Sequence, residues 1–345
     1  MPVALKSLQD LNDLPFDEII DVRSPAEFAE DHVPGAINLP ALDNEERATV
    51  GTIYTQDSPF KARKLGAALV AQNAARHLRG PLADRDGGWR PLVYCWRGGQ
   101  RSGSFTSILQ QIGWRADIVQ GGYRSYRRLV VQALYAKTVP HRVVLIDGGT
   151  GTAKTRVLDL LAEAGAQAID LEGLANHRGS LFGSMGAQPS QKMFESRLAK
   201  TLMQADPAQP LFLEAESNKV GELLIPPALW KAMQTAPRVV LTAPLQARAA
   251  YTARAYADVT RDAARLTDTL TALRPYHSAK QIEAWQELAA QGVFQALAAE
   301  LIALHYDPRY QKKAATHAGK TELWLDALDD ASLRAVIPKI VSSAG

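Results

Sequence analysis

The sequence contains a single cysteine, Cys95, among its 345 residues. No intramolecular disulfide can form, and a cysteine-rich zinc site would lack its usual ligands. Hydrophobic runs are short and interrupted by charge, and none approaches the roughly 20 apolar residues that a membrane span needs. The start of the chain also lacks the basic and apolar segments of a secretory signal. These absences predict a protein of the reducing cytoplasm, with no structural metal and no membrane contact.

The chain also lacks a large excess of either charge, since 39 basic and 36 acidic residues leave a formal net charge of +3. This total does not identify a nucleic-acid binder, but a local basic face can exist within it. Apolar residues make up 46% of the chain, and its length exceeds what one hydrophobic core usually serves. We therefore expect two globular domains.

Strand and helix signals alternate along the chain and restart once. In the first domain, residues 1–137, we expect strands at 18–22, 37–39, 91–94 and 117–119, and a helix that begins at Ser24, Pro25 and Glu27 with a capping box. In the second, residues 138–345, we expect strands at 142–146, 168–170, 211–213 and 239–241, followed by a helical C-terminal part. Both patterns predict an α/β fold with a parallel sheet.

Cys95 opens a loop between a predicted buried strand and a predicted helix. The loop reads Cys95-Trp96-Arg97-Gly98-Gly99-Gln100-Arg101-Ser102. Here a helix N-terminus and guanidinium groups favour the thiolate over the thiol, and the same donors would hold an oxyanion. The alternative is a small buried hydrophobic residue at a strand end. The two arginines and two glycines favour a nucleophile, Cys95, assisted by Arg97 and Arg101.

A second glycine-rich loop precedes the helix expected at 157–164. It reads Gly148-Gly149-Thr150-Gly151-Thr152-Ala153-Lys154-Thr155, which matches the phosphate-loop pattern except for Ala153 in place of the second glycine. Backbone N–H groups would surround phosphate oxygens, Lys154 would neutralise them, and Thr155 could bind Mg²⁺ when that metal is present. We expect right-handed backbone angles at Ala153, because it stands at a helix start. The alternative is an ordinary strand-to-helix turn.

Polar side chains follow two further predicted strands of the second domain. Glu214 and Glu216 follow one of them, and Asp170, His177 and Arg178 follow the other. Ligands of open α/β sheets bind at the carboxyl ends of the strands, so these residues are candidate acid–base groups or ligands. The alternatives are surface acids and a structural histidine.

Two segments interleave aromatic and basic side chains. They contain Arg124, Tyr126, Arg127 and Arg128 near the domain boundary, and Tyr310, Lys312 and Lys313 near the end of the chain. Such groups stack on splayed bases and pair with phosphates, which makes both segments candidate RNA contacts. A solvated helix face gives the same pattern.

The first third of the chain resembles rhodanese-like domains. The resemblance rests on Asp21-Val22-Arg23-Ser24, residues 32–40, the Cys95 loop and Gly121-Gly122-Tyr123. The Cys95 loop is one residue longer than in sulfur-transferring rhodaneses and is similar to that of rhodanese-related cell-cycle phosphatases. A larger loop would admit a phosphate-sized anion, so we expect Cys95 to meet a substituted phosphate.

The order of the two loops, with residues 94–99, 170–183, 189–192 and 214–218, resembles the tRNA 2-selenouridine synthase family over almost the whole chain. The resemblance implies a transferase that converts wobble 2-thiouridine in tRNA to 2-selenouridine through S-geranyl-2-thiouridine. It implies geranyl diphosphate and selenophosphate as co-substrates, no tightly bound organic cofactor, and an enzyme that supplies selenophosphate.

The resemblance also divides the chemistry between the loops. Residues 148–155 would hold the diphosphate, and Cys95 would act in the selenium step, either as a perselenide carrier or by attack on selenophosphate. Two other functions stay open. One is a Cys-x5-Arg phosphatase or arsenate reductase fused to a kinase-like domain, although Tyr94 stands where those phosphatases commonly have histidine. The other is a non-catalytic module that binds nucleotide and RNA. The intact nucleophile loop argues against this second function.

Overall fold

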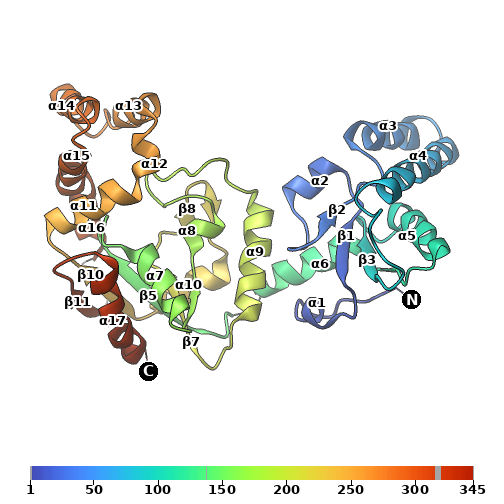
Figure 1. Ribbon diagram of the computed structural model, residues 1–345, viewed down its shortest axis with the longest axis horizontal. Coiled ribbons are helices and arrows are strands. Elements are labelled where there is room, and N and C mark those ends of the chain that lie inside the picture. The colour runs from blue at the N-terminus through green and yellow to red at the C-terminus, as the bar shows by residue number, and fades with distance from the viewer. Residues whose placement is uncertain (1, 137, 315–319, 345) are drawn as a thin grey trace. The chain divides into compact units, whose positions relative to one another are not determined.

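The computed structural model describes residues 2–136, 138–314 and 320–344, without the side chains of residues 311–314. The chain forms two compact units, Met1–Thr138 with Pro189–Gln204, and Val139–Gln188 with Ala205–Gly345. Each is an α/β unit with a parallel sheet, as the sequence predicts (Figure 1). No helix in the described part is long and apolar enough to cross a membrane.

The first unit is built on a four-stranded parallel sheet of order β2-β1-β3-β4. Its strands are β1 (Glu18–Asp21), β2 (Ile37–Asn38), β3 (Pro91–Tyr94) and β4 (Asp117–Ile118). Its helices are α1 (Asp10–Asp13), α2 (Pro25–Glu30), α3 (Asn44–Gln56), α4 (Pro59–Arg79), α5 (Gln100–Ile112), α6 (Gly122–Val131), the π-helical η1 (Gln132–Ala136) and α9 (Gln191–Gln204). The sequence analysis did not identify α3 and α4, which pack together and against α5.

Helix α9 belongs to the first unit, although it lies far beyond the boundary expected after residue 137. The buried carboxylate of Glu195 on α9 forms an ion pair with Arg127 and accepts a hydrogen bond from the Tyr135 hydroxyl at 2.6 Å. Lys192 pairs with Glu30 at 2.6 Å. These contacts attach α9 to residues of α2, α6 and η1.

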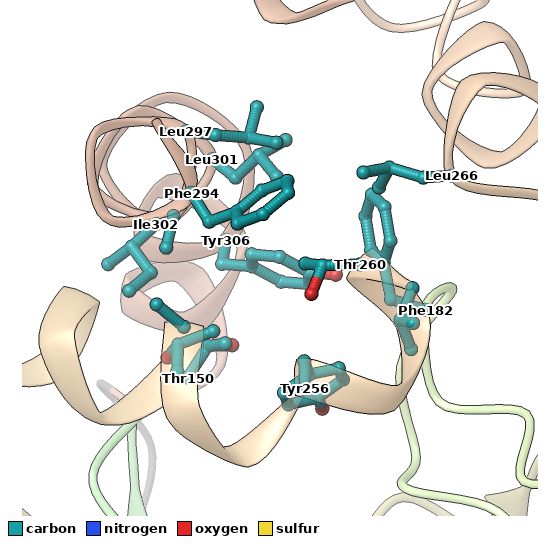
Figure 2. A pocket seen from close by; sticks show the side chains of 14 residues that line it. Thr150, Phe182, Tyr256, Thr260, Leu266, Phe294, Leu297, Leu301, Ile302 and Tyr306 are labelled. Carbon is teal, nitrogen blue, oxygen red and sulfur yellow. The ribbon is translucent and has the colours of Figure 1, made fainter. Parts of the chain in front are cut away.

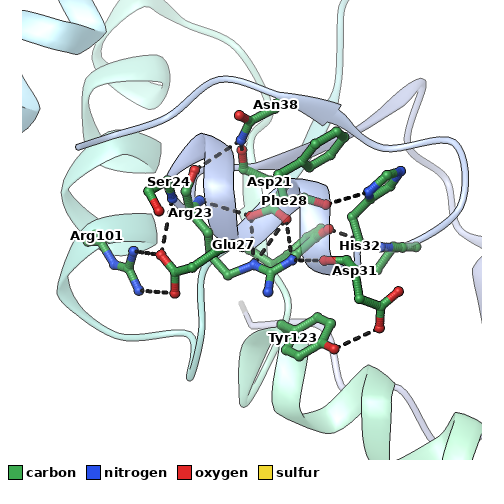
Figure 3. A network of polar contacts seen from close by, with 12 residues as sticks. Asp21, Arg23, Ser24, Glu27, Phe28, Asp31, His32, Asn38, Arg101 and Tyr123 are labelled. Atoms are coloured by element: carbon green, nitrogen blue, oxygen red, sulfur yellow. Dashed lines mark hydrogen bonds and ion pairs between the residues drawn. The ribbon is translucent and has the colours of Figure 1, made fainter. Parts of the chain in front are cut away.

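The end of strand β1 contains a buried ion pair (Figure 3). The guanidinium of Arg23, 1% exposed, donates to both carboxylate oxygens of Asp21, which is fully buried. Arg23 also lies 4.0 Å from the ring centroid of Tyr123, whose hydroxyl donates to Asp31 at 2.7 Å. Since buried charges must be paired, these contacts account for the acid and the arginine of the Asp21–Ser24 motif.

The start of α2 confirms the predicted capping box. The Ser24 N–H donates to the Glu27 carboxylate at 3.1 Å, and Pro25 occupies the first turn. The same carboxylate accepts a hydrogen bond from Arg101 of α5 at 2.8 Å (Figure 3). Glu27 therefore connects the helix after β1 to the helix after the Cys95 loop.

The second unit is built on a five-stranded parallel sheet of order β11-β10-β5-β7-β6. Its strands are β5 (Arg142–Gly148), β6 (Gln167–Ile169), β7 (Pro210–Glu214), β10 (Arg238–Thr242) and β11 (Lys320–Trp324), and β8 (Lys219–Val220) pairs separately with β9 (Leu223–Leu224). Its helices are α7 (Lys154–Glu163), α8 (Leu171–Leu174), α10 (Pro227–Thr235), α11 (Leu245–Ala255), α12 (Ala257–Thr260), α13 (Ala263–Thr271), α14 (Ala279–Ala290), α15 (Phe294–Glu300), the π-helical η2 (Leu301–Tyr306), α16 (Asp307–Ala314) and α17 (Asp330–Ser343).

Among the described residues of this unit, two large apolar cores stand out. One lies between the sheet and helices α7 and α17, with Val157, Leu161 and Ile340 fully buried in it. The other is formed by the helices between β10 and β11 and contains the fully buried Trp285. In Figure 1 these helices, α11 to α15, gather at one end of the unit. The predicted helical C-terminal part is therefore a helical layer inserted before the last strand.

Asp21→Asn should lower the free energy of unfolding of the first unit by about 3–5 kcal/mol, because it leaves the Arg23 charge buried without its counterion. Urea unfolding followed by circular dichroism measures this change. Lys61→Ala removes an exposed ion pair with Asp57 and should cost at most about 1 kcal/mol. Equal, small losses in both variants would contradict the importance of the buried pair.

Candidate active sites

The Cys95 loop is held by close backbone contacts with the glycines that precede α6. A Cβ on Gly122 would lie 2.3 Å from the Cys95 carbonyl oxygen, and one on Gly98 would lie 2.7 Å from the Val119 carbonyl oxygen. Both glycines have positive φ angles, 59° and 66°. The N–H of Tyr123 then donates to the Cys95 carbonyl at 2.8 Å. Only glycine allows this approach, so two motifs that are separate in sequence form one structure.

The environment of the Cys95 sulfur favours ionisation. Burial raises the pKa of the thiol, but the hydroxyl and N–H of Ser102 and the charge of Arg101 lower it, and the net pKa lies below its usual value. The Ser102 hydroxyl lies 3.2 Å from the sulfur and is itself buried. Cys95 is 3% exposed. Hydrogen bonds within the first turn of α5 therefore outweigh desolvation of the thiolate.

The two arginines of the loop lie in different environments. Arg101 is one-fifth exposed and paired with Glu27, so it acts on the sulfur through its charge while its guanidinium is fixed by a carboxylate. Arg97 is exposed at the surface of the loop. Sequence analysis treated the two as equivalent and missed Ser102 as a partner of the sulfur, because a serine on a helix gives no motif signal.

The predicted RNA-contacting residues are divided by burial. Arg124 and Arg128 are exposed on α6. Tyr126 is 2% exposed, which leaves no ring face for a base, and Arg127 is partly buried in its ion pair with Glu195. In the second segment, Tyr310 donates its hydroxyl to Asp147 at 2.9 Å, and the side chains of Lys312 and Lys313 lie outside the described residues.

The phosphate loop joins β5 to α7 with its glycines at close approach points. Gly148 and Gly151 have φ angles of 146° and 82°, and a Cβ on either would lie within 2.6 Å of a neighbouring oxygen atom. Lys154 donates from Nζ to the Gly148 carbonyl at 3.0 Å. The loop curls around its own lysine, which is the arrangement that phosphate oxygens would enter.

The expectation for Ala153 is wrong. Its φ and ψ are 61° and 30°, in the left-handed region, because it caps α7 immediately before the helix begins at Lys154. This is the position where the phosphate-loop pattern has glycine, and its conformation explains that preference. Alanine adopts it at a cost of about 1–2 kcal/mol.

Two buried charged side chains support the phosphate loop, and neither carried a sequence signal. Arg248 of α11 donates twice to the Thr150 carbonyl, at 2.9 and 2.8 Å, and pairs with Asp307 at 2.6 Å. Asp147 accepts from the Gly148 N–H at 2.7 Å and pairs with Arg238, which holds the pKa of Asp147 below its usual value although burial raises it. Both pairs form between elements distant in sequence.

A cavity of about 420 Å³ opens beside the phosphate loop. The predicted residues that line it are Thr150 to Thr155 of the loop together with Asp170, Arg178 and Glu216. Glu172, which was not predicted, lines it as well. Glu214 is fully buried behind this wall and accepts from the Leu171 N–H at 3.0 Å. His177 accepts a hydrogen bond from the Gly179 N–H at 3.1 Å, a local structural contact.

Burial controls the charge of the acids beside the loop. Burial and the charge of Glu216 raise the pKa of Glu172 to about 8, against the attraction of Lys154. Burial and the charge of Asp170 raise the pKa of Glu214 well above its usual value. Both side chains therefore hold a proton to higher pH than an ordinary glutamate does. The side of the cavity formed by these acids therefore carries less negative charge, and repels an anion less, than the number of its carboxyl groups suggests.

The residues next to the phosphate loop fit a loosely held Mg²⁺ rather than a resident one. Among the described residues, no group of three or more histidine, cysteine or acidic side chains is arranged to hold a metal ion. The Thr155 hydroxyl donates to Glu172 at 3.2 Å, so this pair offers one hydroxyl and one carboxyl oxygen. A magnesium ion bound by few protein ligands takes its others from water and substrate phosphates.

Two family models match the chain, and each contains one of the two loops. The family model of the tRNA 2-selenouridine synthase AAA domain matches residues 141–278, and that of the rhodanese-like domain matches residues 2–129. A solved structure of the N-terminal domain of an ATP/GTP binding protein from Clostridium difficile 630 aligns at 30% identity over 38% of this chain and 99% of its own. Its TM-score of 0.33 is too low to compare the folds.

Curated relatives are similar to most of the chain. A tRNA 2-selenouridine synthase from Alcanivorax borkumensis is 37% identical over 71% of this chain and 67% of its own. One from Shewanella denitrificans is 38% identical over 65% and 61%, and one from Marinobacter nauticus is 36% identical over 70% and 65%. The chain thus spans about two thirds, or slightly less, of the length of these relatives.

Ser102→Ala should raise the pKa of Cys95, because it removes the hydroxyl 3.2 Å from the sulfur and leaves burial less opposed. The thiolate fraction at neutral pH then falls. Ultraviolet absorbance of the thiolate against pH measures this cleanly, since the chain has one cysteine. Ser107→Ala, on the same helix and exposed, is the control and should leave the titration unchanged. An unshifted midpoint in Ser102→Ala would show that the hydroxyl is not a donor to sulfur.

Ala153→Gly should raise the free energy of unfolding by about 0.5–1 kcal/mol, because relief of the left-handed alanine exceeds the extra entropy of an unfolded glycine. Ala162→Gly is the control at an exposed position in the last turn of α7 and should lower it by up to about 1 kcal/mol. Denaturant unfolding of both variants gives the comparison. A loss of stability in both would mean that Ala153 is unstrained.

Proposed function

Because the chain belongs to the tRNA 2-selenouridine synthase family, we propose that it replaces the sulfur of 2-thiouridine in tRNA by selenium, through an S-geranyl intermediate. The supporting observation is that one chain carries both a cysteine loop with a lowered thiol pKa and a phosphate loop that opens into a cavity of about 420 Å³. The first suits nucleophilic attack on an anion, and the second suits a diphosphate.

The first step uses the phosphate loop and geranyl diphosphate. The sulfur of 2-thiouridine attacks C1 of the geranyl group, so a C–S bond forms and a C–O bond breaks. The diphosphate leaves with the electron pair, and the base loses its N3 proton. Lys154 and the loop N–H groups stabilise the charge that develops on the leaving group. Mg²⁺, held by Thr155 and the diphosphate oxygens, would add charge neutralisation.

The raised pKa of Glu172 favours this binding. A carboxyl group that takes up a proton more readily opposes the charge of Lys154 and the loop amides less. Arg178 also lines the cavity, and its guanidinium pairs with Asp258 at 3.0 Å.

The second step uses Cys95 and selenophosphate. The thiolate attacks phosphorus, so an S–P bond forms as the P–Se bond breaks, and the selenium leaves as hydrogen selenide. Selenide then adds at C2 of the base and expels the geranyl thiolate, and water hydrolyses the phosphorylated cysteine. A perselenide formed directly from selenophosphate would need an oxidant, whereas attack at phosphorus needs none. The helix N-terminus and the Arg101 charge stabilise both the thiolate and the phosphoryl group.

The tRNA and its supply of selenium are the partners of this reaction. Arg124 and Arg128, exposed on α6 next to the Cys95 loop, and Arg97 in that loop are the described side chains best placed to pair with tRNA phosphates. Selenophosphate would come from an enzyme that makes it, in the cytoplasm where tRNA is modified.

Single variants should separate the two steps. Cys95→Ala should keep geranylation but lower selenation at least about 1000-fold, because it removes the nucleophile. Lys154→Ala should lower geranylation about 100-fold or more, because it removes a charge from the leaving diphosphate. Mass spectrometry of a 2-thiouridine tRNA, incubated first with geranyl diphosphate and then with selenophosphate, records both steps.

Lys339→Ala is the charge-matched control, since Lys339 is exposed on α17. It should leave both steps unchanged. Loss of both steps in Cys95→Ala would contradict the division between the loops. A phosphatase would be favoured instead if the wild-type protein left the mass of the RNA unchanged and hydrolysed a simple phosphate ester.

A further inference from the structure

An apolar pocket lies beside the phosphate loop in the second unit (Figure 2). Its walls are formed mainly by Phe182, Leu266, Phe294, Leu297, Leu301 and Ile302. The pocket has a volume of about 60 Å³. One water molecule needs about 10–15 Å³ by this measure, so the space suits about four to six carbon-sized groups. A pocket with such walls offers nothing to hold water and favours an aliphatic group.

The pocket adjoins the cavity in which the diphosphate is expected. Thr150 of the phosphate loop and Thr252, Tyr256 and Tyr306 line both spaces. Figure 2 shows the ring of Tyr306 between the aliphatic side chains and Thr150. A ligand whose phosphates contact the loop therefore has the apolar pocket directly within reach of its other end.

The junction between the two spaces holds a buried hydroxyl. Thr252 Oγ1 has no hydrogen-bond partner among the described residues. It lies against Gly151 of the loop, where a Cβ would be 2.5 Å from it. An unpaired buried hydroxyl is uncommon. Its oxygen has almost no accessible surface, so this hydroxyl marks the junction but is not a contact for a ligand in the present cavity.

The walls also discriminate between classes of phosphate ligand. The base and ribose of a nucleotide present donors and acceptors that lose free energy when buried without partners. Aliphatic side chains supply none, whereas a hydrocarbon tail requires none. The pocket thus favours a diphosphate ester of a branched aliphatic alcohol over ATP or GTP.

We propose that this pocket holds the distal isoprene unit of geranyl diphosphate while the phosphate loop holds the diphosphate, an assignment that rests on the proposed function. The helical layer between β10 and β11 is then the part of the fold that selects the substrate tail. Leu301 and Ile302 lie where α15 passes into η2, and Ala253 lies on α11 across the pocket.

Titration calorimetry with three ligands tests the proposal: inorganic diphosphate, dimethylallyl diphosphate and geranyl diphosphate. Each buried carbon raises affinity about fourfold, so the five carbons of the distal isoprene unit should make geranyl diphosphate bind about 1000-fold more tightly than dimethylallyl diphosphate, which lacks that unit. Leu301→Ala and Ala253→Phe should each reduce this advantage about tenfold, by removing contacts or by filling the pocket. Inorganic diphosphate should bind all three proteins alike.

Leu304→Ala is the matched control, because Leu304 lies on the same η2 segment as Leu301 but is 46% exposed. This variant should retain the full gain in affinity that the geranyl tail provides. If Leu301→Ala does not fold, as a thermal melt would show, Ala253→Phe at its half-buried position decides the test.

The two possible failures are distinguishable. If both variants bind geranyl diphosphate as tightly as the wild-type protein and still bind inorganic diphosphate, the pocket assignment is overturned. The proposed function is not affected by that result. Wild-type protein that binds no diphosphate ligand contradicts the proposed function itself. Tighter binding of ATP than of geranyl diphosphate, with sensitivity to the same variants, assigns the pocket to a nucleotide and overturns the proposal.

Discussion

Both reactive loops depend on an arginine whose charge is neutralised inside the protein. In the first unit, Arg23 is paired with Asp21 and supports the ring of Tyr123, whose N–H holds the Cys95 carbonyl. In the second, Arg248 is paired with Asp307 and holds the Thr150 carbonyl. Each guanidinium connects the end of a strand or loop to a distant element. These contacts fix the carbonyl groups of Cys95 and Thr150, and with them the course of both loops.

The sequence predicted the parts of this structure that follow from local chemistry. The capping box at Ser24 and Glu27, the two glycine-rich loops after buried strands, and the alternation that produces parallel sheets were all readable. Local chemistry did not reveal that Glu27 also binds Arg101 or that Gly122 contacts the Cys95 carbonyl. These are contacts between segments far apart in the chain, and nothing in either segment alone identifies its partner.

The errors have physical causes. Ala153 was expected to be right-handed because helix starts usually are, but the loop closes over Lys154 only with a left-handed residue before it. Tyr126 looked like a surface aromatic among arginines, yet a helix presents successive residues to different sides and this one faces the core. Helices α3 and α4 and strand β11 were missed because charged residues interrupt their apolar positions.

The placement of α9 has a consequence for any attempt to dissect the protein. The chain leaves the first unit after Thr138, returns for Pro189–Gln204, and leaves again. A fragment that ends at residue 138 would therefore carry Arg127 and Tyr135 without Glu195, and would expose the surface that the buried side chains of α9 cover. Neither half of the chain can be exchanged at a single junction. A recombination event or a cloning scheme that did so would produce an incomplete fold.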